Sequence, residues 1–199
     1  MRKIAYLFLN CFILIVQSSW AQVGQFISAD RFSNSIIKSL CQDKYGNIWI
    51  ATDYGLNKFD GYQFTTYLHD ESDANSLCHN AVVSLLCDRN GHVWVGTNRG
   101  LDRYDSRSNS FIHYEFPDGN RPRIAHLSQL SNGNLFVSTS GYGAYLIGNN
   151  LSMYPTSDYT PELEENYYEQ VYEDSKRRLW RRANNKVIIM KSNNAFYRF

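Results

Sequence analysis

The sequence lacks several features that would place it in a common class. The apolar run of residues 4–16 is too short for a comfortable membrane span, and no later run is long or apolar enough to be one. No stretch repeats its apolar residues with the helical period of about 3.6. The chain carries 20 basic and 19 acidic residues without a basic cluster, and setting aside Arg2 and Lys3 leaves the two signs nearly balanced. These absences argue against a helical solenoid and against nucleic acid or a charged membrane surface as a partner.

Motifs of catalysis and metal binding are also absent. The sequence has no paired carboxylates at catalytic spacing and no nucleophile elbow, and its five histidines show no spacing typical of metal ligands. The glutamates between Glu162 and Glu169 lie in a proline-flanked acidic stretch, which is typical of a solvated connector. We therefore predict that the chain is not an enzyme, and we expect no catalytic residue, no metal site and no cofactor.

Cysteine is scarce, with four residues in the chain. Cys11 lies in the apolar run near the start. Cys41, Cys78 and Cys87 form an odd set for an exported protein. Cys41 and Cys87 fall on equivalent predicted strands but one position out of register, so we expect them to face opposite sheet surfaces. We interpret all three as buried packing residues, and the sequence leaves their redox state open.

The N-terminus has the pattern of a signal peptide. A short basic region, residues 1–3, precedes the apolar run of residues 4–16, and Ser19 and Ala21 place small residues where a signal peptidase reads. We predict a signal peptide over residues 1–21, cleavage before Gln22 and export to the periplasm.

The sequence is dominated by an internal repeat. Residues 43–60 and 88–105 are close copies, and Trp49 and Trp94 stand 45 residues apart. A period in this range is typical of solenoids, propellers and arrays. Weaker copies follow later in the chain. The residues that we expect to hold the repeat structurally are Asp43, Gly46, Trp49, Thr52, Gly55, Asp88, Gly91, Trp94, Thr97, Gly100, Gly133, Phe136 and Trp180.

Each repeat predicts four antiparallel strands. An Asp-x-x-Gly turn precedes a β-branched and aromatic strand, and a Thr-x-x-Gly-Leu turn leads to the next strand. One further strand on each side completes a propeller blade. We predict an all-β fold of about four such blades over residues 22–199, with repeats at approximately 28–67, 76–114, 122–160 and 167–199. Residues 25–27 read as an additional fourth strand, so the strand inventory favours an incomplete propeller over a closed four-bladed ring.

The repeat resembles a known family. The pattern Asp-x-x-Gly-x-Ile/Val-Trp-Ile/Val-x-Thr-x-x-Gly-Leu-x-Arg/Lys-Tyr/Phe-Asp is similar to the two-component regulator propeller repeat, and residues 69–80 resemble its blade connector. The resemblance implies the periplasmic sensor part of a Bacteroides-type hybrid two-component regulator, many of which respond to glycans. Family members continue into further repeats, a membrane helix, a histidine kinase, and receiver and DNA-binding domains. Since the chain stops at Phe199, the resemblance implies an N-terminal fragment without kinase activity.

A ligand site is predicted at the turns between the second and third strands of the blades. These turns share the face over the central channel, and their aromatic, amide, guanidinium and carboxylate groups suit a polyol. We expect an oligosaccharide to contact Asp53, Tyr54, Asn98, Arg99 and Tyr142. Propeller–propeller or homodimer contacts are further expected partners. Two alternatives stay open, namely a secreted propeller lyase or hydrolase and a non-catalytic interaction scaffold.

Overall fold

The computed structural model describes residues 33–155, 170–183, 186–190 and 196–198. The predicted signal peptide over residues 1–21, its cleavage site before Gln22 and the additional strand at 25–27 lie outside these residues. The described part of the chain contains strands and turns but no α-helix. It therefore includes no helix long and apolar enough to cross a membrane.

The strands form four antiparallel sheets, each built from four consecutive strands. The all-β fold and the four-stranded antiparallel blades predicted from the sequence are therefore confirmed. Blade 1 contains β1 (Ile37–Gln42), β2 (Ile48–Thr52), β3 (Gly55–Phe59) and β4 (Phe64–Tyr67). Blade 2 contains β5 (Val82–Cys87), β6 (Val93–Thr97), β7 (Gly100–Asp105) and β8 (Ser110–Tyr114). Blade 3 contains β9 (Ile124–Gln129), β10 (Leu135–Thr139), β11 (Ala144–Ile147) and β12 (Met153–Pro155). Blade 4 contains β13 (Gln170–Glu173), β14 (Leu179–Ala183), β15 (Lys186–Met190) and β16 (Phe196–Arg198).

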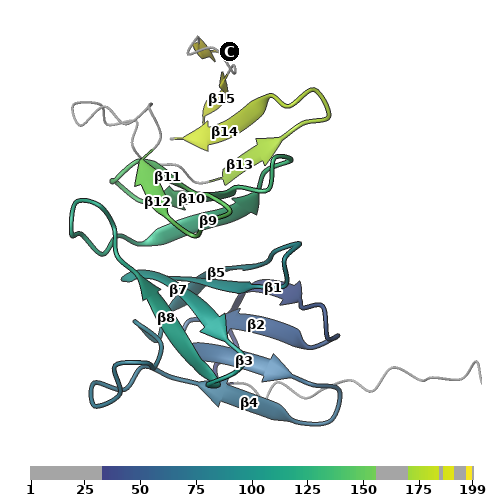
Figure 1. Cartoon of the computed structure of the whole chain (residues 1–199), viewed down its shortest axis with the longest axis vertical. Helices are drawn as coiled ribbons and strands as arrows, with labels where there is room; N and C mark the ends of the chain where they lie inside the picture. Colours follow the sequence, from purple (N-terminus) through teal and green to yellow (C-terminus); the bar gives the residue numbers. More distant parts are fainter. Residues whose placement is uncertain (1–32, 156–169, 184–185, 191–195, 199) are drawn as a thin grey trace, which may run out of the picture.

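The blades pack against one another in chain order. Their first strands are neighbours in the series β1, β5, β9 and β13, and blades 1 and 4 lie at opposite ends of the stack (Figure 1). The described blades thus form an open series rather than a closed ring. Blade 1 shows the consequence, since Leu40 is 58% exposed whereas Leu85, at the same position of blade 2, is 7% exposed.

The core lies between the blades. Trp49 is fully buried and packs in one cluster with Leu85 and Val95 of blade 2. In the same way Trp94 packs with Leu127 of blade 3. Trp49 and Trp94 therefore each face the following blade. The second strands of blades 2 and 3 are buried along their whole length, as expected of strands packed between neighbouring sheets.

Gly96 permits blades 2 and 3 to approach closely. A Cβ atom at this position would lie 2.7 Å from Cγ2 of Ile124 and would also collide with Oγ of Ser84. The hydroxyl of Ser84 donates to the carbonyl of Ile124 at 3.4 Å. A side chain at position 96 would therefore push the two sheets apart.

The turn before each second strand has a constant shape. Gly46 and Gly91 adopt φ angles of 89° and 85°, and Arg177 takes the same left-handed conformation in blade 4 with φ 59°. The backbone N–H of each of these residues donates to the carbonyl of the aspartate three positions before, at 2.9–3.0 Å. The turn is therefore kept in blade 4 although arginine replaces the glycine.

The interpretation of Cys41 and Cys87 as packing residues was wrong. Cys41 and Cys87 form a disulfide between blades 1 and 2, with their Cα atoms 5.9 Å apart. The register is as predicted. Cys41 pairs with Trp49, whereas Leu86 pairs with the equivalent Trp94, so Cys87 lies one position further along its strand than Cys41 does. The blades stack face to back, so opposite surfaces of neighbouring sheets meet. Side chains on those opposite surfaces therefore face each other.

Candidate functional site

The predicted ligand residues project from turns that a threonine holds. Thr52 donates its hydroxyl to the carbonyl of Gly55 at 2.8 Å and accepts the backbone N–H of Tyr54 at 3.2 Å. Thr97 does the same for Gly100 and Arg99, at 3.0 and 3.1 Å. The threonine therefore fixes the backbone of each turn, while the N–H groups of Asp53 and Asn98 donate to the carbonyls of Ile36 and Ala81 in the segment before the first strand.

The five predicted residues lie at the same end of three consecutive blades. Asp53 and Tyr54 belong to the β2–β3 turn, Asn98 and Arg99 to the β6–β7 turn, and Tyr142 to the β10–β11 turn. Tyr54 and Tyr142 are 52% and 37% exposed, so part of each ring is accessible. The carboxylate of Asp53 forms an ion pair with Lys38 at 3.2 Å. Ligand binding by these residues stays a prediction.

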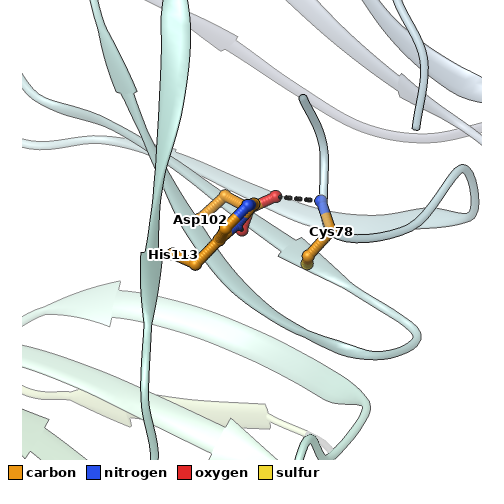
Figure 2. A group of neighbouring side chains, drawn as sticks. All are labelled: Cys78, Asp102 and His113. Carbon is orange, nitrogen blue, oxygen red and sulfur yellow. Dashed lines mark hydrogen bonds and ion pairs between the residues drawn. The ribbon is translucent and has the colours of Figure 1, made fainter. Parts of the chain in front are cut away.

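Next to these turns, blade 2 carries a compact polar cluster that the sequence did not indicate. It consists of Cys78 from the connector before β5, Asp102 from β7 and His113 from β8 (Figure 2). Asp102 is fully buried, and its Oδ1 lies 2.6 Å from Nδ1 of His113. Its Oδ2 accepts the backbone N–H of Cys78 at 2.9 Å. The other imidazole nitrogen, Nε2, lies 2.8 Å from the carbonyl oxygen of Ala74.

The electrostatics of the cluster follow from these contacts. The hydrogen bond to the Asp102 carboxylate raises the pKa of His113, and burial opposes this only in part. Burial raises the pKa of the Cys78 thiol strongly, and the negative charge of Asp102 adds to the effect. The cluster therefore favours the neutral form of the Cys78 thiol and the protonated form of the His113 imidazole.

This geometry does not form a cysteine nucleophile with a general base. Such a relay needs one imidazole nitrogen on the carboxylate and the other on the thiol. Here Nε2 of His113 is directed to the carbonyl of Ala74, and the sulfur of Cys78 lies 3.1 Å from the hydroxyl of Thr97. The protonated thiol and the occupied base both argue against nucleophilic catalysis at this point.

A cavity of about 320 Å³ adjoins the cluster. All three cluster residues line it, together with Arg99 from the predicted ligand set. Arg121 adds a second guanidinium group to the wall. Arg99 therefore connects the turns predicted to bind a ligand with the buried acid and histidine of blade 2.

A second cavity, of about 470 Å³, lies between blades 1 and 2 at the other end of the strands. It is lined by the turns on that side and by Lys58, whose ammonium group lies over the rings of Trp49 and Tyr104 at 5.4 and 5.7 Å. None of the five predicted ligand residues lines it.

Four stacked antiparallel sheets with this strand order define a domain of the β-propeller type. Two segments, residues 31–54 and 76–99, match the family described as two component regulator propeller. These two segments are therefore similar to repeats of that family.

Known proteins similar to this chain include signalling proteins and an enzyme. Histidine kinase P4 of Formosa agariphila is 34% identical over 82 residues, which are 39% of this chain and 6% of that protein. The extracellular domain of a hybrid two component system from B. thetaiotaomicron superposes with a TM-score of 0.72 and 21% identity, over 88% of this chain and 27% of that one. Virginiamycin B lyase from Staphylococcus aureus superposes with a TM-score of 0.64 and 16% identity, over 85% and 57%. The chain therefore spans a small part of the signalling proteins that it resembles, and the structural similarities define the fold alone.

Proposed function

We propose that this chain is the ligand-receiving propeller module of a hybrid two-component signalling system. The observation that carries the proposal is the match of residues 31–54 and 76–99 to the two component regulator propeller family. The similarity to a histidine kinase and to the extracellular domain of a hybrid system supports the same class. In this proposal the blades bind a signal molecule, and binding shifts the populations of two conformational states of the signalling kinase.

The module is proposed to work in the periplasm. The signal-peptide pattern of residues 1–21 supports export. The disulfide between Cys41 and Cys87 is of a kind that persists in oxidising compartments and is rare in the cytosol.

The proposed ligand is an oligosaccharide held at the turn end of blades 1–3. The exposed rings of Tyr54 and Tyr142 offer surfaces on which sugar C–H faces stack. Arg99, Asn98 and Asp53 offer donors and acceptors for hydroxyl groups. Contacts between two copies of the module, or between this propeller and another, are proposed as the way in which binding is passed on.

Titration calorimetry of the purified chain against a panel of oligosaccharides tests the proposal. We expect saturable binding to one sugar class, weakened at least tenfold by Tyr54→Ala and by Arg99→Ala. Tyr62→Ala is the matched control for the tyrosine, because Tyr62 is 90% exposed at the opposite end of blade 1. Arg107→Ala, in the turn between β7 and β8, is the control for the arginine.

Analysis of the same mixtures for cleaved sugar separates a receptor from an enzyme. An unchanged sugar after prolonged incubation supports the receptor. Release of products by the wild-type chain would instead favour a propeller lyase or hydrolase.

A further inference from the structure

Blades 1 and 2 carry two versions of one hydrogen-bonded set at equivalent positions. In blade 1 the backbone N–H of Ser33 donates to Oδ1 of Asn57 at 3.1 Å, and the hydroxyl of Thr66 donates to the same oxygen at 2.9 Å. The amide of Asn57 in turn donates to the hydroxyl of Ser33 at 2.8 Å. This set joins the segment before β1 to the two outer strands, β3 and β4, with neutral side chains only.

In blade 2 all three members are replaced by residues that bind metal ions. Cys78 stands at the position of Ser33, and the two side chains lie 3.1 Å from the equivalent threonine hydroxyls. Asp102 replaces Asn57, and His113 stands opposite Asp102 as Thr66 stands opposite Asn57. Because the neutral set already joins the connector to the outer strands, the structural task does not require a thiol, a carboxylate and an imidazole.

The imidazole of His113 is held in the tautomer that a metal ligand needs. Its Nε2 lies 2.8 Å from the carbonyl of Ala74, which can only accept, so Nε2 carries a proton. Its Nδ1 lies 2.6 Å from the carboxylate of Asp102, which also accepts. At this distance a proton lies between Nδ1 and the carboxylate, and a metal ion bound to Nδ1 would take the place of that proton. A backbone carbonyl on the second nitrogen is a common way to orient a metal-binding histidine.

The three ligand atoms are close enough for one ion. The sulfur of Cys78, a carboxylate oxygen of Asp102 and an imidazole nitrogen of His113 all lie within 4.8 Å of one another. Around a tetrahedral zinc ion, with bonds of about 2.0–2.3 Å, neighbouring ligand atoms lie roughly 3.3–3.8 Å apart. Binding would therefore draw the sulfur inward and open the imidazole–carboxylate contact, both by small side-chain rotations.

We propose that Cys78, Asp102 and His113 form a binding site for a divalent transition metal ion of the zinc type. The thiol and Nδ1 each give up a proton to the solvent, and the sulfur, the nitrogen and one carboxylate oxygen become the three protein ligands. The thiolate and the carboxylate together neutralise the charge of the ion. A fourth position is left toward the cavity that Arg99 and Arg121 line. The site does not depend on the proposed sensing function.

Cobalt(II) absorption of the full chain, without reductant, tests the site. We expect one Co²⁺ per chain with the near-ultraviolet band of a thiolate–cobalt bond, and we expect Zn²⁺ to abolish the band by displacing the ion. Cys78 is the free cysteine of the described residues, since Cys41 and Cys87 are bonded to each other. A wild-type chain that binds Co²⁺ without this band would overturn the proposal.

The structure supplies a matched variant. The combination Cys78→Ser, Asp102→Asn and His113→Thr rebuilds in blade 2 the set that blade 1 already holds. We expect this variant to keep the circular dichroism spectrum of the wild type and to bind Zn²⁺ at least about 100-fold more weakly, since even supporting residues of metal sites change affinity by 10- to 100-fold. His79→Gln is the control for adventitious binding by a nearby histidine, and we expect it to leave the affinity unchanged.

The single variant Cys78→Ser keeps the test decisive if the triple variant does not fold. It removes only the sulfur and introduces the residue of blade 1. Loss of the thiolate band with a large loss of Zn²⁺ affinity supports the site. An unchanged Zn²⁺ affinity in Cys78→Ser contradicts it.

Discussion

The indole N–H of Trp94 donates to Oδ2 of Asp88 at 2.9 Å, six residues earlier in the chain. The same bond, also at 2.9 Å, joins Trp49 to Asp43 and Trp180 to Asp174. In blade 3 both partners change together, to Leu130 and Phe136. The aspartate of the repeat therefore has two tasks, because it caps its own turn and also satisfies the one polar atom of a buried tryptophan.

This pairing predicts non-additive mutations at blade 2. Asp88→Leu alone leaves the Trp94 indole N–H buried without an acceptor and should lower the free energy of unfolding by about 2–3 kcal/mol. Trp94→Phe alone leaves the carboxylate without one of its donors. The double variant, which copies Leu130 and Phe136 of blade 3, should cost less than the sum of the two single changes. Urea unfolding of the four proteins gives the coupling, and strict additivity would show that the bond contributes little.

The aspartates of the turns predict a loss of stability in acid. Burial raises the pKa of Asp43 and Asp88, but hydrogen bonds from the tryptophan, the turn backbone and the residue four positions on outweigh it, so both pKa values lie below the ordinary value. A depressed folded-state pKa contributes stability above the unfolded-state pKa of about 3.9, and this contribution is lost as the pH falls through the lower folded-state pKa. Urea unfolding between neutral pH and about pH 3 should show this decline.

The Asp88→Leu, Trp94→Phe variant serves as the control for that experiment. Because it lacks one of the depressed carboxylates, its stability should fall less steeply with acid than that of the wild type. If the free energy of unfolding falls equally steeply with acid in the two proteins, Asp88 does not contribute to the loss of stability.

Arg177→Gly should stabilise the chain. Arg177 is exposed and adopts φ 59°, a conformation that costs a residue with a Cβ atom about 1 kcal/mol relative to glycine. Gly46→Ala is the matched reverse change, because a Cβ atom there meets only Gln42 at 4.0 Å, so the change measures the backbone conformation alone. Thermal unfolding should move up for the first variant and down for the second. A lower melting temperature for Arg177→Gly would mean that the arginine side chain contributes contacts of its own.

The disulfide predicts a large effect of reduction. Cys41 and Cys87 are 46 residues apart in the chain, and closing a loop of that length stabilises the folded state by roughly 4 kcal/mol in the chain-entropy description. The Cys41→Ser, Cys87→Ser variant should lose about 2–4 kcal/mol relative to the oxidised wild type. Peptide mapping without reduction should recover the linked pair. Recovery of both cysteines as free thiols, or linkage of either to Cys78, would contradict the structure.

The fold could be predicted from the sequence because its determinants are local. The turn glycines, the Asp–Trp interval and the Thr-x-x-Gly-Leu motif each fix a hairpin within a few residues, and their recurrence after 45 residues fixes the blade. The disulfide depends instead on how one sheet packs on the next. Register alone placed Cys41 and Cys87 on opposite surfaces, and only the stacking brings those surfaces together.

The blade 2 cluster could not be found from motif spacing for a related reason. Cys78 and Asp102 lie 45 residues after Ser33 and Asn57, but His113 lies 47 residues after Thr66, because the hairpin between β7 and β8 is two residues longer than its counterpart in blade 1. The equivalence of the two sets therefore appears in the strand pairing and is hidden in a fixed-interval alignment. Comparing strand partners across the repeats would have shown it.

Signalling in the source bacterium provides the most direct test of the proposed function. Strains encoding Tyr54→Ala or Arg99→Ala in the chromosome are grown on the oligosaccharide that the purified chain binds, and sugar-induced transcription is compared with the wild type. We expect induction to fall sharply in both strains and to remain normal in strains carrying Tyr62→Ala or Arg107→Ala. Equal induction in all strains would contradict a role for this propeller in receiving the signal.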